Sequence, residues 1–295
     1  RPSIYNLVCK LAEVTGDILS PFSLSGVERD TQPVHSGGFS TVYRGTWENR
    51  TVAVRQLHRF NAQPEKSDSF QESFSGELLK WRQLRHPNVL PFLGVDQQKC
   101  APRLAMISPW IKNGTAREMI EKMERPPIMQ WVREVAEGLE YLHDEMVVHG
   151  DLRGANILVD DDMRVRLTDF GLATFAHPRH SRNSVTCPRA RWMAPELLDD
   201  SIPRPNRSTD VFSFASTCLE LFTGKVPFSK VDRTADVARI VINGERPSRP
   251  ICSDCIHQFP DTVWELMQDC WLQNPSERPK MSTVTSLLRQ TSGDT

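Results

Sequence analysis

The stretch from residue 149 to 171 reads HGDLRGANILVDDDMRVRLTDFG and concentrates the side chains best suited to chemistry. Asp151 and Asn156 lie five residues apart, and Asp169 follows them after two short apolar runs. A carboxylate can accept a proton from a reacting hydroxyl. Carboxylate and amide oxygens are also the kind of ligand that Mg²⁺ prefers. These three side chains are therefore the first candidates for a reactive centre.

The two apolar runs, at 157–159 and 165–167, flank three consecutive aspartates at 160–162. Short β-branched runs on either side of a polar turn predict the two strands of a tight hairpin. Such a hairpin would set the distances between the candidate groups.

The order of these residues resembles the signature of protein kinases, in which H-R-D-L-x-x-x-N is followed by D-F-G. Every position matches except one, since Gly150 stands where the signature has Arg. The resemblance implies phosphoryl transfer, in which positioning and neutralisation of charge do most of the catalytic work. It implies that Asp151 accepts the proton of an attacking hydroxyl and that Asn156 and Asp169 hold Mg²⁺ against the phosphates of ATP. Arg153, two residues after Asp151, would complete the catalytic set.

The bulk composition is that of an ordinary globular protein. The 295 residues are 39% hydrophobic and 25% charged, with a formal net charge of −1, and a chain of this length can bury one large core or two separate ones. The balanced charge gives no reason to expect a nucleic-acid partner. No apolar run approaches the roughly 20 residues that span a bilayer, and the first residues lack the apolar core of a signal peptide. The oligomeric state is left open.

The seven cysteines are odd in number and scattered, which favours reduced thiols and an intracellular, cytoplasmic location. Cys252 and Cys255 form a CxxC pair that invites a zinc site. No second pair follows, so two free thiols are favoured over bound zinc.

Four segments are expected along the chain. Apolar residues at helical spacing near the start predict a helical leader that caps the main domain. A change from strand patterns to helix patterns near residue 110 predicts a boundary between two lobes. The expected segments are the leader at 1–22, an N-lobe at 23–110, a C-lobe at 111–290 and a polar tail at 291–295.

The sequence from Val34, VHSGGFSTVYRGTW, continues after a turn at Asn49-Arg50 as TVAVRQL. Its alternation predicts a hairpin that feeds a third strand. In kinases the equivalent turn is a glycine-rich loop, G-x-G-x-x-G-x-V, that covers the phosphates, and only its middle glycine is present here. An ordinary glycine-containing hairpin is the alternative. The residues that would line this loop and roof the adenine are Val34, His35, Gly37, Gly38, Ser40 and Val42.

The third strand departs furthest from the kinase pattern. The signature V-A-I-K reads here as Val-Ala-Val-Arg, from Val52 through Ala53 to Arg55. The resemblance implies a nucleotide-binding strand whose residue 55 bridges the α- and β-phosphates and a glutamate on the next helix, matched by Glu77. Arginine keeps the charge but is longer, planar and forked. An Arg55–Glu77 pair can form bidentately and would then hold the guanidinium away from the phosphates.

Residues 103–114 read RLAMISPWIKNG, an apolar strand followed by a short polar link. In a kinase this link joins the lobes, and its backbone bonds the adenine edge. The match places Ser108 at the gatekeeper position. It also directs the carbonyl of Pro109 and the amide and carbonyl of Ile111 toward adenine.

Apolar residues at helical spacing from Ile128 to Leu142 predict a long amphipathic helix. A second, apolar helix with Ser/Thr caps is expected from Ser208, and Asp210 within it resembles the kinase aspartate that braces the catalytic loop. Glu196 and Arg278 are the expected members of a buried ion pair. The expected fold is α+β and bilobal, with a small antiparallel sheet lobe that carries one main helix and a larger, mostly helical lobe.

Over about 34 to 290 the chain resembles the eukaryotic protein kinases, and within them the tyrosine-kinase-like (TKL) group. HPNVLPFLGV, HGDLRGANIL, RWMAPE and CWLQNPSERP carry the resemblance. It implies Mg²⁺-dependent transfer of the γ-phosphoryl of ATP to Ser/Thr hydroxyls of protein substrates in signal transduction. Tyrosine hydroxyls stay open, because RWMAPE is also similar to tyrosine kinases and Arg153 replaces the usual Lys.

Two other functions stay open. His35, Ser40 and Arg55 fit a pseudokinase, which binds nucleotide or a partner but transfers phosphate poorly. HGD-L-x-x-x-N also resembles aminoglycoside and choline kinases, but RWMAPE, Asp210 and Arg278 disfavour that family. The intact base and metal ligands favour an active protein kinase.

In kinases the activation segment runs from D-F-G to A-P-E, which here means from Gly171 to Glu196. Gly150 bears on regulation, because the Arg that it replaces usually binds a phosphate on this segment. That segment carries three candidate phosphosites, Ser181, Ser184 and Thr186. We expect the triple alanine variant to keep at least roughly half of the initial rate of phosphate transfer, since a phosphate there has lost its usual arginine partner. Near-complete loss of that rate would contradict the expectation.

Overall fold

The computed structural model describes residues 22–37, 40–58, 78, 80–96, 105–170, 187–202, 204–251, 255 and 259–291. They fall into two compact units. One contains the chain up to Arg85 together with Leu90–Ile111, and the other contains His86–Val89 and the chain from Lys112 onward. The expected leader at 1–22 and tail at 291–295 lie almost wholly outside the described residues.

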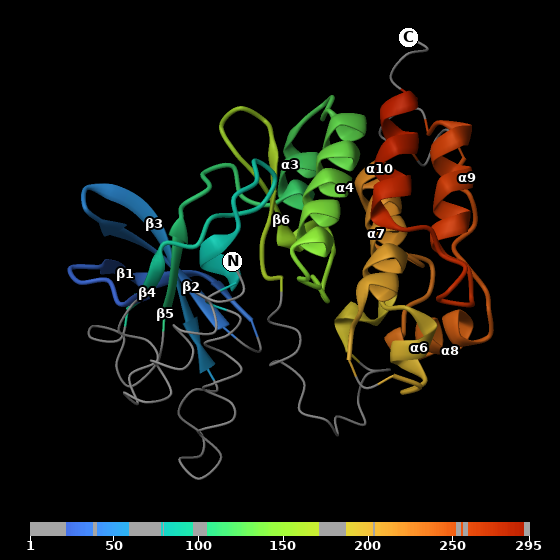
Figure 1. Cartoon of the computed structure of the whole chain (residues 1–295), viewed down its shortest axis with the longest axis horizontal. Coiled ribbons are helices and arrows are strands. Elements are labelled where there is room, and N and C mark those ends of the chain that lie inside the picture. The colour runs from blue at the N-terminus through green and yellow to red at the C-terminus, as the bar shows by residue number, and fades with distance from the viewer. Residues whose placement is uncertain are drawn as a thin grey trace. The chain divides into compact units, whose positions relative to one another are not determined.

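The first unit contains an antiparallel sheet of five strands in the order β1-β2-β3-β5-β4 (Figure 1). The predicted hairpin that feeds a third strand is confirmed. The strands are β1 Glu28–Ser36, β2 Ser40–Trp47, β3 Arg50–Leu57, β4 Gly94–Asp96 and β5 Ala105–Pro109.

The turn between β2 and β3 lies one residue earlier than predicted. Trp47 pairs with Arg50, so the turn consists of Glu48 and Asn49, with φ of 48° and 62°. Positive φ at both central residues is the condition of the tight turns whose twist matches paired strands, and asparagine accepts it readily.

The two faces of the sheet differ because successive strand residues point to opposite sides. Val52 and Val54 of β3 pack with Val27, Ala105 and Ile107 in the core of the first unit. The intervening residues of β3 are only partly buried. This second face carries the side chains expected to contact nucleotide.

The second unit is mostly helical and contains a short hairpin (Figure 1). The predicted long helix is confirmed as α4 Ile128–Asp144, and the predicted hairpin as β6 Ile157–Val159 and β7 Val165–Leu167. A small antiparallel sheet in one unit and a helical second unit confirm the expected fold class. The other elements are α3 Ala116–Lys122, η4 Gly154–Asn156, η6 Pro188–Trp192, α6 Pro195–Leu198, α7 Arg207–Thr223, α8 Thr234–Ile242, α9 Asp261–Cys270 and α10 Met281–Gln290.

Helix α7 is buried along nearly its whole length and contacts α3, α4, α9, η4 and η6. Its start differs from the predicted Ser/Thr cap. The Asn206 side chain accepts a bond from the Thr209 amide, and the Thr209 side chain accepts one from the Asn206 amide. This capping box satisfies two backbone donors that the helix leaves open. Gly224 ends the helix in the left-handed conformation, φ 65°.

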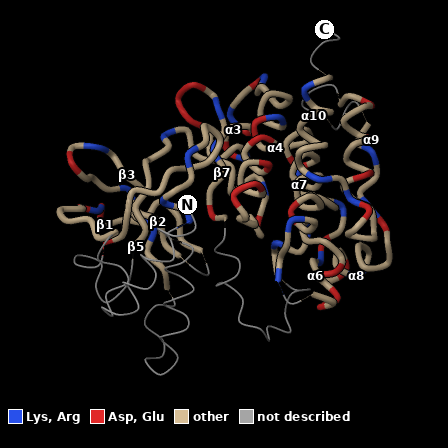
Figure 2. Tube along the Cα trace, viewed as in Figure 1, with Lys and Arg blue, Asp and Glu red and all other residues tan. Residues whose placement is uncertain are grey.

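Charged residues of both signs are spread over the surface of the helical unit (Figure 2). In the described part of the chain, no helix has the length and apolar character needed to cross a membrane. Among the cysteines described there, Cys187, Cys218 and Cys270 are free thiols. Cys252, the other half of the CxxC pair, lies outside the described residues.

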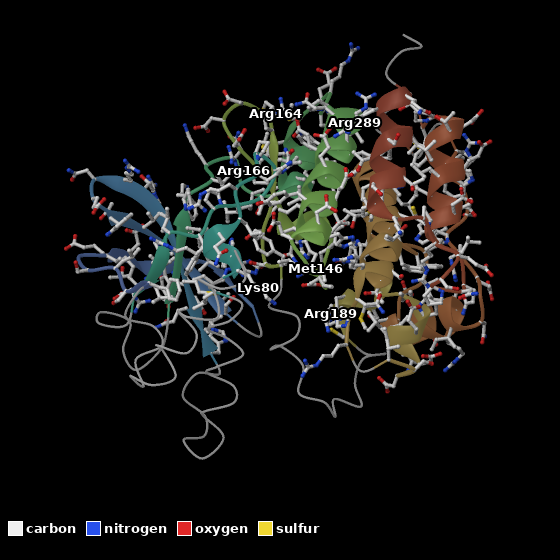
Figure 3. The ribbon with its side chains drawn as sticks, viewed as in Figure 1. Lys80, Met146, Arg164, Arg166, Arg189 and Arg289 are labelled. Carbon is white, nitrogen blue, oxygen red and sulfur yellow. The ribbon has the colours of Figure 1, made fainter. Side chains whose placement is uncertain are left out.

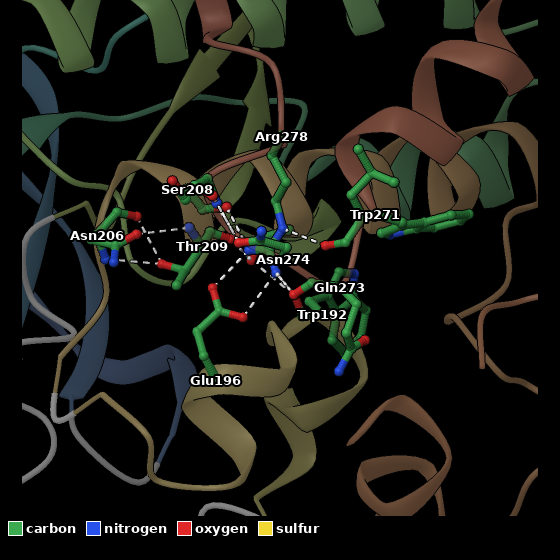
Figure 4. Close-up of polar contacts among 12 residues, drawn as sticks. Trp192, Glu196, Asn206, Ser208, Thr209, Trp271, Gln273, Asn274 and Arg278 are labelled. Atoms are coloured by element: carbon green, nitrogen blue, oxygen red, sulfur yellow. Dashed lines mark hydrogen bonds and ion pairs between the residues drawn. The ribbon is translucent and has the colours of Figure 1, made fainter. Parts of the chain in front are cut away.

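The predicted Glu196–Arg278 ion pair is confirmed (Figure 4). The two guanidinium nitrogens of Arg278 donate to the two carboxylate oxygens of Glu196, at 2.7 and 2.9 Å. Arg278 also donates to the carbonyls of Ser208 and Leu272, at 3.0 and 2.8 Å. Its side chain is 0% exposed, so the pair connects α6 to the loop before α10 inside the unit.

We expect Arg278→Met to lower the free energy of unfolding by about 3–5 kcal/mol, because the change leaves a buried carboxylate without its partner. Adding Glu196→Met should cost less than the sum of the two single changes, since both charges are then gone. Urea unfolding followed by circular dichroism gives these values.

The matched control is Arg289→Met, which removes a pair with Glu137 in which the arginine side chain is 62% exposed. Exposed pairs contribute about 0–1 kcal/mol. An Arg278→Met variant that is no less stable than Arg289→Met would show that the buried pair does not hold the unit together.

Candidate active site

Asn156 and Asp151 are joined directly. The Asn156 Nδ2 donates to the Asp151 carbonyl at 2.7 Å and to the Asp151 Oδ2 at 3.1 Å. This orientation leaves the other atom of the amide, Oδ1, to face a cation. Arg153 Nε lies 3.6 Å from the same Asp151 Oδ2. The predicted base therefore has both an amide donor and a positive charge close to the same carboxylate oxygen.

The hairpin brings Asp169 to the same end as Asn156. Ile157 pairs with Leu167, and the Thr168 amide donates to the Asn156 carbonyl at 3.0 Å. Asp169 follows with φ 64°, a left-handed conformation that aspartate tolerates better than most residues. The two residues expected to be metal ligands, Asn156 and Asp169, thus lie at the open end of the predicted hairpin.

The donor set fits magnesium. An amide oxygen and a carboxylate are hard oxygen ligands, and Mg²⁺ usually binds one or two such groups together with substrate phosphates and waters. Among the described residues there is no group of three or more His, Cys, Asp or Glu side chains that would enclose a metal. A magnesium ion on Asn156 and Asp169 would therefore need phosphate and water to complete its shell.

Helix α4 holds the hairpin from one side. The buried carboxylate of Glu134 accepts the Val165 amide at 2.7 Å, and the Trp131 indole donates to the Met163 carbonyl at 2.9 Å. Arg164, which projects from the hairpin (Figure 3), pairs with Glu134. These contacts fix β7 and, through it, the position of Asp169.

Gly138 allows α4 to approach this closely. A Cβ there would lie 2.9 Å from the Asn88 carbonyl oxygen and 3.0 Å from Leu167 Cδ1. Asn88 and Leu167 occupy the position beside Gly138, and they are joined to each other because the Asn88 carbonyl accepts the Leu167 amide at 2.8 Å. The glycine therefore permits a three-way contact of helix, loop and hairpin.

Asp210 of helix α7 bonds the backbone of the loop that leads from His149 through Asp151 to Asn156, the catalytic loop. Its Oδ2 accepts the His149 amide at 2.8 Å and lies 2.9 Å from His143 Nε2, and its Oδ1 accepts the Gly150 amide at 2.8 Å. The predicted brace of the loop backbone is confirmed. Gly150 adopts φ +77°, a conformation that glycine reaches without the steric penalty of other residues.

Three further polar residues of α7 contact the loop or the segment before Glu196, and sequence reasoning missed them. Thr217 Oγ1 donates to the Leu152 carbonyl at 3.2 Å, and the Ser213 hydroxyl donates to the Trp192 carbonyl at 2.8 Å. Glu220 accepts the Gly154 amide at 2.8 Å. With Asp210, these residues recur every three or four positions and share one helix face. That spacing in an otherwise apolar run was the available signal.

His149, at the start of the catalytic loop, is fully buried. Its Nδ1 accepts the Asp151 amide at 3.3 Å, and its ring meets Phe170 edge-on at 6.2 Å. Burial lowers the pKa of His149, and the nearby carboxylates of Asp210, Asp151 and Asp169 offset only part of that effect. The lowered pKa favours the neutral imidazole, whose Nδ1 accepts the Asp151 amide.

In the first unit, the expected nucleotide contacts share one face of the sheet. Val42 pairs with Arg55, and Ala53 pairs with Ser108. Directly paired residues point the same way, and residues two apart on a strand do so too. The partly buried Val42, Ala53 and Arg55 therefore lie together, with Ser108 beside them.

The glycine-containing turn lies at one end of that face. His35 pairs with Val42, and the Gly37 amide donates to the Ser40 carbonyl at 2.9 Å. Arg55 Nη1 donates to the Ser40 hydroxyl at 3.5 Å, so the arginine reaches the base of the turn. Val34 is 59% exposed, which leaves its side chain accessible.

The expected link to adenine begins at the end of β5. Pro109 and Ile111 are partly buried there, and the intervening Trp110 amide donates to the Thr51 carbonyl at 3.2 Å. Several expected residues lie outside the described part of the chain, among them Glu77, the expected partner of Arg55. These residues are Gly38, Glu77, Gly171, Ser181, Ser184 and Thr186.

We expect Asp210→Asn to lower the free energy of unfolding by about 2–4 kcal/mol, because hydrogen bonds to a charged acceptor contribute about 1.5–3 kcal/mol each and an amide turns a donor toward a backbone N–H. Asp236→Asn is the control, since that carboxylate is 40% exposed on α8. Equal stability of the two variants in urea would contradict the role of Asp210.

Comparison with known proteins identifies the family of the chain. Residues 29–288 match the family model described as protein tyrosine and serine/threonine kinase. The chain is 30% identical over 261 residues to the dual specificity protein kinase pyk3 of Dictyostelium discoideum, which covers 87% of this chain and 18% of that protein. It is 29% identical over 262 residues to the serine/threonine/tyrosine-protein kinase HT1 of Arabidopsis thaliana, which covers 86% and 64%.

A third relative is the human mitogen-activated protein kinase kinase kinase 11, 32% identical over 266 residues, covering 85% of this chain and 30% of that protein. The chain thus spans less than two thirds of the length of each of these relatives. Because the family model extends over both units and over every element described at the site, the chain belongs to the protein tyrosine and serine/threonine kinase family.

Proposed function

We propose that this chain transfers the γ-phosphoryl group of ATP to serine and threonine hydroxyls of protein substrates, with Mg²⁺. The observation that carries the proposal is the joined pair of Asp151 and Asn156 at the open end of the hairpin that bears Asp169. It combines a base with oxygen ligands for a cation, which is the set that phosphoryl transfer needs.

In the proposed reaction, Asp151 orients the attacking hydroxyl and accepts its proton. The Asn156 amide keeps that carboxylate in one rotamer through its bond at 3.1 Å. Arg153, 3.6 Å from Asp151, places a positive charge near the transferred group. Magnesium held by Asn156 and Asp169 would neutralise the phosphate charge.

The sheet face of the first unit would hold the nucleotide. Val42, Ala53 and Ser108 supply a mainly apolar surface suited to adenine, whose edge would bond the carbonyl of Pro109 and the backbone of Ile111. The turn from Val34 to Ser40 would cover the phosphates through its backbone amides. Arg55 is the proposed phosphate contact, and its bond to Ser40 ties that cation to the turn.

The names of the relatives include serine/threonine, tyrosine and dual specificity kinases, so tyrosine is the alternative acceptor. We propose an intracellular, cytoplasmic enzyme with a lobe boundary at 110–111 and a leader at 1–22. A pseudokinase is the alternative function, and the specific observation behind it is Arg55 in place of lysine.

The test compares wild type, Asp151→Asn and Arg55→Lys in transfer of phosphate from Mg-ATP to a random peptide pool. Loss of the positioned base should lower the rate of Asp151→Asn by about 10²–10⁴. The wild-type product should contain mostly phosphoserine and phosphothreonine.

Equal rates for wild type and Asp151→Asn, with a gain in Arg55→Lys, would favour the pseudokinase. A product that is mostly phosphotyrosine would overturn the choice of acceptor while leaving the reaction class intact.

A further inference from the structure

Glu220 is a buried acid in the apolar helix α7. The residue is 2% exposed, and burial raises the pKa of its carboxyl. An isolated carboxylate in such a place is unfavourable unless it is hydrogen-bonded. The contacts of Glu220 should therefore explain why the helix carries an acid there.

One oxygen of Glu220 joins two segments that are distant in sequence. Its Oε2 accepts the Gly154 amide at 2.8 Å and the Trp192 indole Nε1–H at 2.9 Å. Gly154 opens the turn η4 that ends at Asn156. Trp192 ends η6, directly before the segment that leads to Glu196. The carboxylate thus ties the catalytic loop and the end of the activation segment to one atom.

The loop approaches this carboxylate closely at Gly154, where there is no side chain. A Cβ on residue 154 would lie 2.9 Å from Glu220 Cδ and 3.0 and 3.1 Å from its two oxygens. Real Cβ atoms essentially never come closer than 3.0 Å. Any other residue at 154 would push the carboxylate or the loop away.

Two cations act electrostatically on the carboxylate. The charges of Arg117, on α3, and Arg153, in the loop, favour the ionised form of Glu220 and partly offset the effect of burial on its pKa. Arg153 is also the ion-pair partner of Asp151. The environment of Glu220 is therefore linked to the proposed base by a shared arginine as well as by the loop backbone.

We propose that Glu220 is a positioning residue for phosphoryl transfer, which fixes the loop that carries Asp151 and Asn156 and the segment that ends in Trp192 in one register on helix α7. The inference rests on the proposed function. In this role Glu220 acts through its bonds to the Gly154 amide and the Trp192 indole and not by contact with nucleotide or acceptor. Its effect is on the geometry of the groups that do.

The test compares Glu220→Gln with Glu220→Leu. The glutamine Oε1 can accept both N–H groups, whereas leucine has similar size and no acceptor. Since small misplacements of catalytic groups can lower rates by about 10², we expect Glu220→Leu to lower kcat by about 10- to 100-fold. The KM for ATP should change less than about threefold, because a positioning defect acts on the chemical step. Glu220→Gln should keep kcat within about threefold of wild type.

A spectroscopic readout separates positioning from unfolding. In ¹H–¹⁵N spectra, the Trp192 indole signal and the Gly154 amide signal should shift in Glu220→Leu and stay near their wild-type positions in Glu220→Gln. Trp192→Phe is a milder variant, which removes one donor and keeps an aromatic ring. The kcat of Trp192→Phe should lie between those of Glu220→Gln and Glu220→Leu.

Wild-type kcat in a folded Glu220→Leu, or a loss in Glu220→Gln as large as in Glu220→Leu, would overturn the proposal. If Glu220→Leu does not fold, Trp192→Phe decides it, since an unchanged kcat there would overturn the coupling to Trp192. If wild type transfers no phosphate, the proposed function fails by itself. The two N–H signals then still show whether Glu220 holds the loop, and unshifted signals in Glu220→Leu overturn that contact.

Discussion

The buried carboxylate of Asp210 is the contact on which the geometry of the catalytic loop depends. Its two oxygens accept two consecutive backbone amides of the loop and lie against His143 of α4. A buried charge is stable only when such bonds replace its lost hydration. The loop and the carboxylate therefore hold each other in place. Because Asp210 belongs to a helix buried along nearly its whole length, the loop takes its position from the core of the unit.

The two long helices of this unit act on different parts of the site. Helix α4 fixes the hairpin through Glu134, Trp131 and Gly138, and so sets Asp169. Helix α7 fixes the loop through Asp210, Thr217 and Glu220, and so sets the position of Asp151. Asn156 lies where the two influences meet, since its side chain bonds Asp151 and its carbonyl accepts the amide of Thr168. The proposed base and the proposed metal ligands are thus positioned by two different helices.

Gly150 shows how a departure from the family pattern can leave this geometry intact. Its backbone adopts a left-handed conformation and its amide is bound by Asp210. Glycine adopts that conformation without the penalty that a side chain adds. In the family pattern an arginine at this position usually binds a phosphate on the activation segment, so we propose that the change affects control more than the arrangement of the site.

Local patterns and motif spacing predicted much of this site from the sequence. The hairpin at 157–167, the brace by Asp210 and the Glu196–Arg278 pair follow from short motifs. Glu134 and Glu220 belong to none of the short motifs, and their partners include backbone amides 31 and 66 residues away in the sequence. For Glu220 the available signal was its spacing from Asp210 along one face of α7. The helix cap was misassigned for a related reason, since Ser208 and Asn206 are both good caps and only the observed bonds distinguish them.

The most direct measurement is native-state hydrogen exchange of the His149 and Gly150 amides in the wild-type chain. If the loop is held by a carboxylate in the buried core, both amides should exchange only through openings as costly as those that expose the amides of α7. Exchange of these two amides at the rate of an exposed loop, with α7 still protected, would contradict the account. The catalytic loop would then be positioned by something other than helix α7.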